Sequence, residues 1–280
     1  MNFIQAILMG IVQGLSEFLP ISSSAHLVFT SNFYKVIADE PIHAQSSQEI
    51  FFDIMVHLGT LAAVLIFFRK DIVKIIKAFV NAINQKNWSD KDAKIGLFII
   101  IGTVVSALIA YPINDFAAFL VYKPELVGAF LIITSLIPFF SEYLAKYKEA
   151  RKSEVDFKTS VLIGIAQGLA ALPGFSRSGW TIATGLFCGL DRVTAARYSF
   201  LLSIPIILGA SMVYPLVEIN LNEISTYNWG AIFAGTLVSG VVGYLCIKYF
   251  MKFLAKFSMN VFACYCFVVG LFTMIFFTIN

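Results

Sequence analysis

Long, nearly uninterrupted runs of apolar residues dominate the chain. A helix needs about 20 mainly apolar residues to cross a membrane, and six runs have the length for one crossing each. They cover residues 51–68, 95–111, 126–142, 198–216, 229–248 and 259–279. We therefore expect an all-α, polytopic membrane protein with six full transmembrane helices, forming a single integral membrane domain over residues 1–280.

Two further apolar stretches are interrupted by polar and helix-breaking residues. The first, residues 1–34, contains Glu17, Pro20, a run of three serines and His26. The second, residues 159–190, is interrupted in its middle by Pro173, Gly174, Ser176, Arg177, Ser178 and Gly179. Because such residues end helices, each stretch predicts two short helices joined by a turn rather than one crossing.

Basic residues are concentrated in three of the connections between the predicted crossings. They lie in residues 69–94, 143–158 and 248–256, whereas residues 112–125 hold one Lys and residues 217–228 hold no basic residue. Basic connections stay in the cytoplasm. We therefore expect these three to be cytoplasmic and the other connections to lie outside.

Parity then decides how the two interrupted stretches run. Lys158 and Arg192 flank the second stretch on the cytoplasmic side, so this stretch must enter and leave the membrane on the same side, as a re-entrant helix hairpin. The first stretch leads into an outside connection. If it is also a hairpin it enters from outside, and both chain termini lie outside.

An internal repeat supports this arrangement. Residues 10–15 read Gly-Ile-Val-Gln-Gly-Leu and residues 164–169 read Gly-Ile-Ala-Gln-Gly-Leu, and a proline followed by serines comes soon after each copy. Three predicted crossings follow each copy. Three is an odd number, so the second copy is expected upside down relative to the first, as in inverted-topology repeats. The halves would be about residues 1–157 and 158–280.

Composition agrees with a membrane protein and excludes several other classes. Of the 280 residues, 59% are hydrophobic and 13% charged, against roughly 45–50% and 25% in soluble domains. The net charge of +3 offers no large basic surface for nucleic acid. The four cysteines lie in or beside apolar runs without a zinc spacing. A soluble enzyme, a disulfide scaffold and a nucleic-acid binder all fit poorly.

The interrupted stretches carry three ionisable residues at bilayer depth, namely Glu17, His26 and Arg177. Such groups are costly in a membrane, so their first interpretation is functional. The alternative is a buried ion pair between Glu17 and Arg177 that only holds the two turns together. After each turn, serines are followed by a helical run, so a helix is expected to begin there. Helix N-termini suit an anion. The candidate anion-binding residues are Ser22, Ser24, Gly174, Arg177, Ser178 and Gly179.

The same stretches offer candidates for cation binding. Gln13 and Glu17 are four residues apart and share a helix face, where an amide oxygen and a carboxylate could hold a hard cation such as Mg²⁺. Asp53 and His57 are spaced in the same way just inside the next apolar run. They could face the same cavity as supporting partners. A simple interfacial helix end explains that pair equally well.

A cation, an arginine and helix N-termini beside a nucleophile and a base describe phosphoryl transfer. Ser23 or Ser176 would be the nucleophile and His26 the general base or acid, or Glu17 would activate water directly. A phosphate-binding loop of the Walker type needs a lysine that is absent near Gly174. The acid-phosphatase type of membrane lipid phosphatase is excluded because Ala183 stands where that family has a histidine.

Two sequence blocks carry a resemblance to a known family. Residues 13–27 read Gln-Gly-Leu-Ser-Glu-Phe-Leu-Pro-Ile-Ser-Ser-Ser-Ala-His-Leu, and residues 173–179 read Pro-Gly-Phe-Ser-Arg-Ser-Gly. Residues 52–53 and 200–205 extend the match over the whole chain. The sequence resembles the undecaprenyl-diphosphate phosphatase family, the bacitracin-resistance membrane proteins of bacteria.

The resemblance implies a function and a location. The expected enzyme is an undecaprenyl-diphosphatase, which hydrolyses the C55 lipid diphosphate to the monophosphate and phosphate. It would thereby recycle the lipid carrier of peptidoglycan synthesis and confer bacitracin resistance. Activity would require a divalent cation, Mg²⁺ or Ca²⁺, and the active site would open to the outer, periplasmic side of the cytoplasmic (inner) membrane.

The resemblance also assigns motif residues. The family's glutamate-rich motif maps to Gln13 and Glu17, and two departures stand out. Gln13 replaces a glutamate that some members have. Ala25 replaces a glycine that often precedes the histidine, and we expect this alanine to narrow the range of backbone conformations open to that turn. The serine-histidine motif maps to Ser23 and His26, and the arginine motif to Ser176 and Arg177.

Two other assignments stay open from the sequence. Inverted repeats are common in transporters, so a lipid flippase or small-molecule transporter on the same architecture is the alternative function. A purely structural scaffold would leave the polar turns unexplained. A homodimer is one assembly that such a membrane protein could form.

Overall fold

The computed structural model describes residues 2–37, 46–145, 152, 154–218 and 221–279. Apart from one isolated bridge between Lys152 and Leu190, these residues form helices, turns and bends, which confirms the all-α expectation. The helices are α1 (Phe3–Ser16), α2 (Ser23–Ile37), α3 (Ser47–Phe67), α4 (Arg69–Gln85), α5 (Lys91–Ala110), η1 (Tyr111–Ile113), α6 (Asn114–Leu120), α7 (Pro124–Ala145), α8 (Phe157–Leu169), α9 (Arg177–Phe187), α10 (Arg192–Glu218), η2 (Leu221–Thr226), α11 (Trp229–Leu254) and α12 (Asn260–Ile279).

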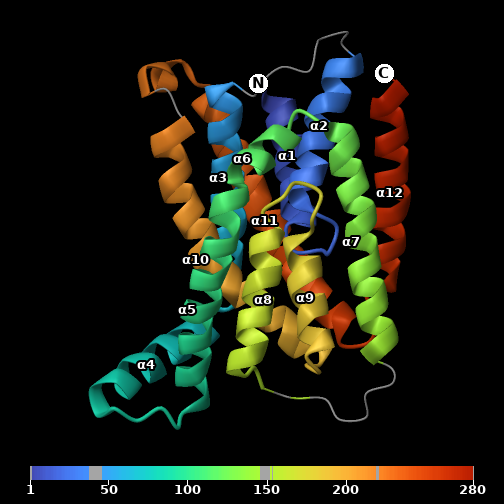
Figure 1. The fold of residues 1–280 in the computed structure, drawn as a ribbon. Coiled ribbons are helices and arrows are strands. Elements are labelled where there is room, and N and C mark those ends of the chain that lie inside the picture. The colour runs from blue at the N-terminus through green and yellow to red at the C-terminus, as the bar shows by residue number, and fades with distance from the viewer. Residues whose placement is uncertain (1, 38–45, 146–151, 153, 219–220, 280) are drawn as a thin grey trace.

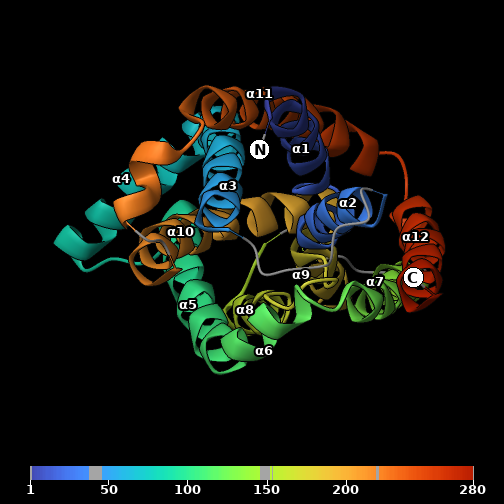
Figure 2. The same cartoon turned by 90° about the horizontal axis from the view of Figure 1, so that it is seen from above.

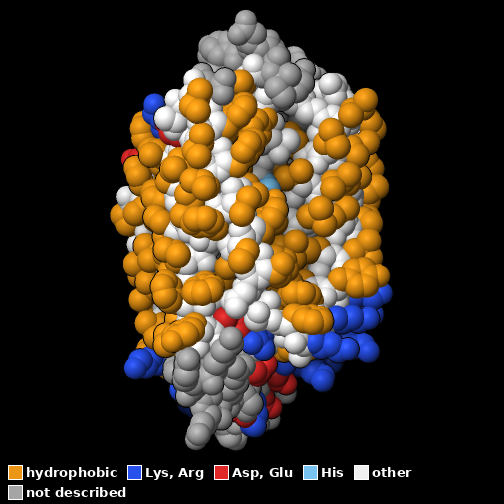
Figure 3. Space-filling model, turned by 90° about the vertical axis from the view of Figure 1, so that its right-hand side faces the viewer, with side chains coloured by type: hydrophobic (Ala, Val, Ile, Leu, Met, Phe, Trp, Pro, Cys, Tyr) orange, Lys and Arg blue, Asp and Glu red, His pale blue; other side chains and the backbone are white. Residues whose placement is uncertain are grey.

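Six helices in the described part of the chain are long and apolar enough to cross a membrane, as expected. They are α3, α5 continued through α6, α7, α10, α11 and α12. They run along one common axis (Figure 1) and form a rough ring when seen from above (Figure 2). Hydrophobic side chains cover the middle of the face shown in Figure 3. The protein is therefore a multi-pass membrane protein.

Residues 69–85 differ from the expectation that residues 69–94 form a basic loop. They form α4, because apolar residues recur there at helical spacing between the lysines. Lys86, in a left-handed conformation with φ of 52°, ends this helix. Asp90 then starts α5 by accepting hydrogen bonds from the backbone N–H groups of Asp92 and Ala93.

Both interrupted stretches fold as pairs of helices joined by a turn. α1 and α2 are joined by residues 17–22, and α8 and α9 by residues 170–176. The two pairs come from opposite ends of the molecule and their turns meet near its middle (Figure 1). The Ser22 hydroxyl donates a hydrogen bond to the Phe175 carbonyl at 3.4 Å, so the two turns contact each other directly. The Ser178 hydroxyl at the beginning of α9 also donates to the Leu19 carbonyl of the first turn, at 2.8 Å.

Helix α1 packs against α11 through glycine. A Cβ atom on Gly10 would lie 2.5 Å from the Gly235 carbonyl oxygen, and one on Gly14 would lie 2.8 Å from that of Ser239. Such distances leave no space for a side chain. Small residues let helix backbones approach closely in membranes, and here they hold α1 beside a full-length helix.

Helix α8 packs against α5 in the same manner. Cβ atoms on Gly164 and Gly168 would each lie 2.8 Å from a carbonyl oxygen, those of Gly102 and Ser106 respectively. The Ser106 hydroxyl also donates to the Gly164 carbonyl at 2.9 Å. Both copies of the repeated segment are thus placed by close backbone contact with one long helix each, α11 and α5.

The two ends of the molecule differ in charge. Lysine and arginine side chains gather at the lower end in Figure 3, whereas α1 begins and α12 ends at the opposite end (Figure 1). At the basic end Asp156 caps α8 by accepting from the Thr159 N–H at 2.8 Å. Its pKa is lowered well below the usual range because the Lys152 ammonium and Thr159 donate hydrogen bonds to the carboxylate.

Gly10→Ala should destabilise the protein, because its methyl group would overlap the backbone of α11. Overpacking of this kind costs about 1–3 kcal/mol, so the melting temperature in detergent should fall by several degrees. Gly209→Ala in α10 is the matched control, since outside the adjoining backbone of its own helix no atom lies within 4 Å of its added Cβ. Equal melting temperatures for the two variants would contradict the close contact.

Candidate active site

The first turn begins directly after α1 and carries Glu17 into the centre of the molecule. The backbone N–H of Glu17 still donates to the Gln13 carbonyl at 3.0 Å, so the carboxylate is held at the end of a rigid helix. Ser22 takes a left-handed conformation with φ of 70°, and its hydroxyl accepts from the Ala25 N–H at 3.3 Å. Ala25 itself lies buried in the first turn of α2, so the unusual backbone conformation falls on Ser22 and not on Ala25.

The second turn depends on a glycine and on a threonine from α7. Gly174 has a φ of 99°, and a Cβ there would lie 2.6 Å from both the Phe130 Cβ and the Val127 carbonyl oxygen. The Thr134 hydroxyl donates to the Gly174 carbonyl at 3.0 Å and accepts from the Ser176 N–H at 3.2 Å. It lies equally close to the Trp180 indole nitrogen, at 3.2 Å. One side chain therefore fixes the turn that precedes Arg177.

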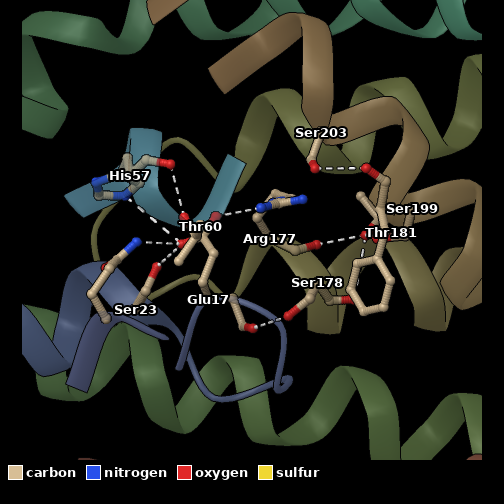
Figure 4. A network of polar contacts seen from close by, with 12 residues as sticks. Glu17, Ser23, His57, Thr60, Arg177, Ser178, Thr181, Ser199 and Ser203 are labelled. Carbon is tan, nitrogen blue, oxygen red and sulfur yellow. Dashed lines mark hydrogen bonds and ion pairs between the residues drawn. The ribbon is translucent and has the colours of Figure 1, made fainter. Parts of the chain in front are cut away.

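Glu17 is the centre of the polar cluster (Figure 4). Its Oε2 accepts hydrogen bonds from the Ser23 hydroxyl at 2.7 Å and from the Gln13 amide nitrogen at 3.0 Å, and the His57 Nε2 lies 3.8 Å away. Its Oε1 is paired with the Arg177 guanidinium. The Glu17 side chain is only 5% exposed, so these groups take the place of water around its charge.

Arg177 is the first residue of α9 and faces Glu17 across the two turns (Figure 4). Thr181, one helical turn further on, donates to the Arg177 carbonyl at 2.7 Å and contacts the Ser199 hydroxyl at 2.5 Å, which ties α9 to α10. The Nη1 of Arg177 is buried and has no hydrogen-bond partner among the described residues. A guanidinium with one paired and one unpaired nitrogen is suited to take up an anion.

A cavity of about 390 Å³ adjoins this cluster. Its polar wall includes the beginnings of α2 and α9, where Ser23, Ser24, Arg177 and Ser178 lie, so two helix N-termini border it. An apolar wall is formed by α3 and α10. The apolar residues on that side are Ile50, Ile54, Ile206, Ile207 and Ala210.

The structure brings most of the predicted site residues together. Gln13, Ser23 and His57 surround Glu17, and Arg177 is paired with it. The predicted residues that line the cavity are Glu17, Ser23, Ser24, Asp53, His57, Ser176, Arg177 and Ser178. Asp53 and His57 therefore lie at the same cavity, one turn apart on α3, as one of the two interpretations of that pair expects.

Five predicted residues do not line this cavity, and Gln13, which is hydrogen-bonded to Glu17, is one of them. His26 lies half-buried with its Nδ1 2.8 Å from the Ser22 carbonyl oxygen and its Nε2 2.8 Å from the Tyr265 hydroxyl. Its ring stacks on Tyr265 of α12, with centroids 5.7 Å apart. The other three, Ser22, Gly174 and Gly179, shape the backbone of the turns, and the Gly179 N–H donates to the Ser176 hydroxyl at 3.1 Å.

Several residues at the site carry no recognisable sequence signal. Thr134 stands in an ordinary apolar span, and Tyr265 likewise. The apolar wall from α3 and α10 could be found from sequence only by knowing that these two helices meet. These residues are revealed by tertiary contacts between segments far apart in the chain.

Comparisons with known proteins identify the group to which this architecture belongs. The family model of the bacitracin resistance protein BacA matches residues 6–272. The chain belongs to this family. It is 40% identical to the undecaprenyl-diphosphatase of Methanobrevibacter smithii, over 97% of this chain and 96% of that protein. It is 39% identical to the undecaprenyl-diphosphatase of Rubrobacter xylanophilus, over 96% of each chain.

The effects of substituting Glu17 and Arg177 on the stability of the protein should be coupled. Arg177→Gln leaves the buried carboxylate without its cation, which typically costs about 3–5 kcal/mol, so the melting temperature should fall sharply. The double variant Glu17→Gln with Arg177→Gln should recover part of that loss, because no unpaired charge remains. Thermal unfolding of Glu17→Gln, Arg177→Gln and the double variant measures the coupling.

Lys91→Gln provides the control for this experiment, since it breaks an exposed ion pair with Glu154. It should leave the melting temperature unchanged. If the double variant were as unstable as the sum of the two single variants, Glu17 and Arg177 would not be coupled.

Proposed function

We propose that the protein hydrolyses undecaprenyl diphosphate to undecaprenyl phosphate and phosphate, which recycles the lipid carrier for peptidoglycan synthesis and confers resistance to bacitracin. The observation that carries this proposal is the Glu17–Arg177 cluster beside two helix N-termini and an apolar wall. A lipid diphosphate needs both kinds of surface. The relatives named undecaprenyl-diphosphatase support it, and no relative reported above supports the flippase or transporter alternative.

The substrate would lie with its diphosphate on the polar wall and the start of its tail against α3 and α10. The unpaired Nη1 of Arg177 would bind a phosphate oxygen, and the N–H groups in the first turns of α2 and α9 would bind others. The isoleucines at 50, 54, 206 and 207 would contact the isoprene units. This arrangement orients the terminal phosphorus toward Glu17 and Ser23.

Glu17 is the base that the geometry supports best. Its Oε2 already accepts a hydrogen bond from the Ser23 hydroxyl at 2.7 Å. It can therefore take the proton of that hydroxyl, or one from a water, as the new oxygen–phosphorus bond forms. The bond from the terminal phosphorus to the bridging oxygen breaks, and undecaprenyl phosphate leaves. Attack by water gives phosphate directly, whereas attack by Ser23 gives a phosphoserine, which a water activated by Glu17 must then hydrolyse to release phosphate. Ser176 is less suited to be the nucleophile, because its hydroxyl caps the Gly179 N–H and contacts Ser178. The role of His26 as base or acid stays a prediction.

The residues around Glu17 also fit a hard divalent cation, Mg²⁺ or Ca²⁺. The Gln13 amide donates an N–H to Glu17, and its Oε1 is buried without a partner among the described residues. With the amide turned over, Oε1 would join the Glu17 carboxylate and the Ser23 hydroxyl as an oxygen ligand. A cation bound there would neutralise charge on the diphosphate. Gln13 thus provides an amide ligand where some members of the family have a carboxylate.

The two helix pairs are proposed to be re-entrant hairpins of an inverted-topology repeat. Support comes from α1 and α8, which run in opposite directions (Figure 1) and pack through equivalent glycines on α11 and α5. The first turns of α2 and α9 are also alike, with Ser22 contacting Ser24 and Ser176 contacting Ser178 at the same distance of 3.3 Å.

The charge distribution supports an orientation in the cytoplasmic membrane. With the basic end in the cytoplasm, the beginning of α1 and the end of α12 face the periplasmic side (Figure 1). The cavity is bordered by the first turns of α3 and the second half of α10, so it would open toward that outer side. A homodimer stays a prediction.

Phosphate release from undecaprenyl diphosphate by the purified protein tests the proposed function. Glu17→Ala and Arg177→Ala should each lower kcat by about 10³-fold or more, and Ser23→Ala should lower it further than Ser176→Ala does. Circular dichroism and size-exclusion profiles establish that each variant is folded. Full activity of folded Glu17→Ala and Arg177→Ala would refute the assignment of the site.

Removal of divalent cations should abolish phosphate release, and added Mg²⁺ or Ca²⁺ should restore it. Gln13→Ala should raise the Mg²⁺ concentration needed for half-maximal rate by at least about tenfold, while Gln167→Ala, the equivalent glutamine of the second repeat, should not. Activity that survives exhaustive chelation would contradict a cation at Glu17.

A further inference from the structure

A second cavity lies at the basic end of the molecule, away from Glu17. It has a volume of about 280 Å³ and lies between the beginning of α5, the beginning of α10 and residues 154–155. On α10 it is bordered by Thr194, Arg197, Tyr198 and Leu201, whereas the active-site cavity meets the same helix at residues 206–211. The two cavities therefore face opposite ends of α10.

Cations are in excess around this second cavity. Its wall contains Lys91, Lys94 and Arg197 against Asp92 and Glu154. With α4 included, this region carries seven basic residues, three in the wall and four on α4, and three acidic ones, two in the wall and one on α4. The region therefore favours an anionic ligand.

Two of the wall's cations have nitrogens available for such a ligand. Lys94 is exposed and has no ion pair in the described part of the chain. Arg197 contacts Asp71 of α4 with one Nη atom at 2.5 Å, and a guanidinium has further N–H groups. Tyr198 is already committed, since its hydroxyl donates to the Phe98 carbonyl at 2.9 Å. A phosphate group would thus be held by Lys94 and Arg197.

An apolar groove adjoins the charged cavity and continues from it toward the middle of the molecule. The groove has a volume of about 250 Å³, lies between α4, α5 and α10, and shares Leu201 with the charged cavity. Along both α5 and α10 the charged residues of the cavity come first. The residues that line the groove follow one to two helical turns further into the membrane. Its wall contains Ile72, Ile75, Ile76, Phe79, Ile99, Ile100 and Ile204.

Helix α4 brings this groove to the membrane interface. Val73, Ile76, Val80 and Ile83 on α4 are large apolar residues that are about half exposed, and lysines occupy other positions of the same helix. An amphipathic helix of this kind lies in the headgroup region of a bilayer. Lipids of the basic-side leaflet would therefore reach both the charged cavity and the groove.

We propose that this is a binding site for an anionic phospholipid of the cytoplasmic leaflet. Lys94 and Arg197 bind its phosphate, and one acyl chain lies in the groove between α4, α5 and α10. The joined apolar groove distinguishes a lipid from a free phosphate ion, for which a charged cavity alone would suffice. The site is separate from the one at Glu17 and independent of the reaction proposed there.

The test measures binding of dioleoylphosphatidylglycerol to delipidated, full-length protein by native mass spectrometry, with dioleoylphosphatidylcholine in parallel. Lys94→Gln should weaken binding of the anionic lipid about tenfold, which corresponds to the loss of one charged contact. Ile100→Trp, which fills the groove, should weaken it as well. Lys252→Gln, the same change at an exposed lysine near the end of α11, should not.

Several outcomes would overturn the proposal. Equal affinity for the two lipids would exclude recognition of the anionic headgroup. An equal effect of Lys94→Gln and Lys252→Gln would indicate diffuse attraction to the basic end. Inorganic phosphate at millimolar concentration could displace the lipid while Ile100→Trp binds the lipid as well as the unaltered protein does. That result would indicate an ion site in which the groove has no role.

Discussion

The ion pair between Glu17 and Arg177 joins the two interrupted helix pairs of this protein at its centre. The two residues are 160 positions apart in the chain and come from turns that approach each other from opposite ends. A charged side chain inside an apolar belt is strongly unfavourable unless it is paired and hydrogen-bonded. The position of each turn therefore depends on the other, and the polar chemistry of the site is possible only where the turns meet.

The turns themselves break two helices inside the membrane-spanning body, so their backbone groups need partners. The partners come from side chains of neighbouring elements. Thr134 of α7 holds the Gly174–Ser176 segment, and Ser178 of α9 holds the first turn at Leu19. Close glycine packing of α1 on α11 and of α8 on α5 then sets the depth at which each turn lies. The same contacts that stabilise the fold therefore align the groups around the cavity.

The molecule is asymmetric along its axis in both charge and cavities. The cavity beside Glu17 combines two helix N-termini with an apolar wall and faces the end where basic residues are sparse, whereas the proposed phospholipid site faces the basic end. Both sites place cations beside an apolar surface, as an amphipathic ligand requires. They differ in that Arg177 is mostly buried and paired with a central carboxylate, while Lys94 is exposed.

The sequence by itself determined the six membrane helices, the two interrupted stretches and the excess of basic residues at one end. Each of these follows from local composition, since a run of about 20 apolar residues or a proline beside serines constrains the chain wherever it occurs. The repeated glycines and the spacing of Gln13 and Glu17 were likewise visible. These local features were enough to name most of the polar residues that line the cavity.

Only the tertiary structure decided which side chains face one another. It placed His26 against Tyr265 rather than in the cavity, put the left-handed conformation on Ser22, and brought Thr134 to the second turn. It also showed that residues 69–85 form a helix that borders a groove. These outcomes depend on contacts between segments far apart in the chain, where close packing selects one rotamer and one partner among several that local sequence allows.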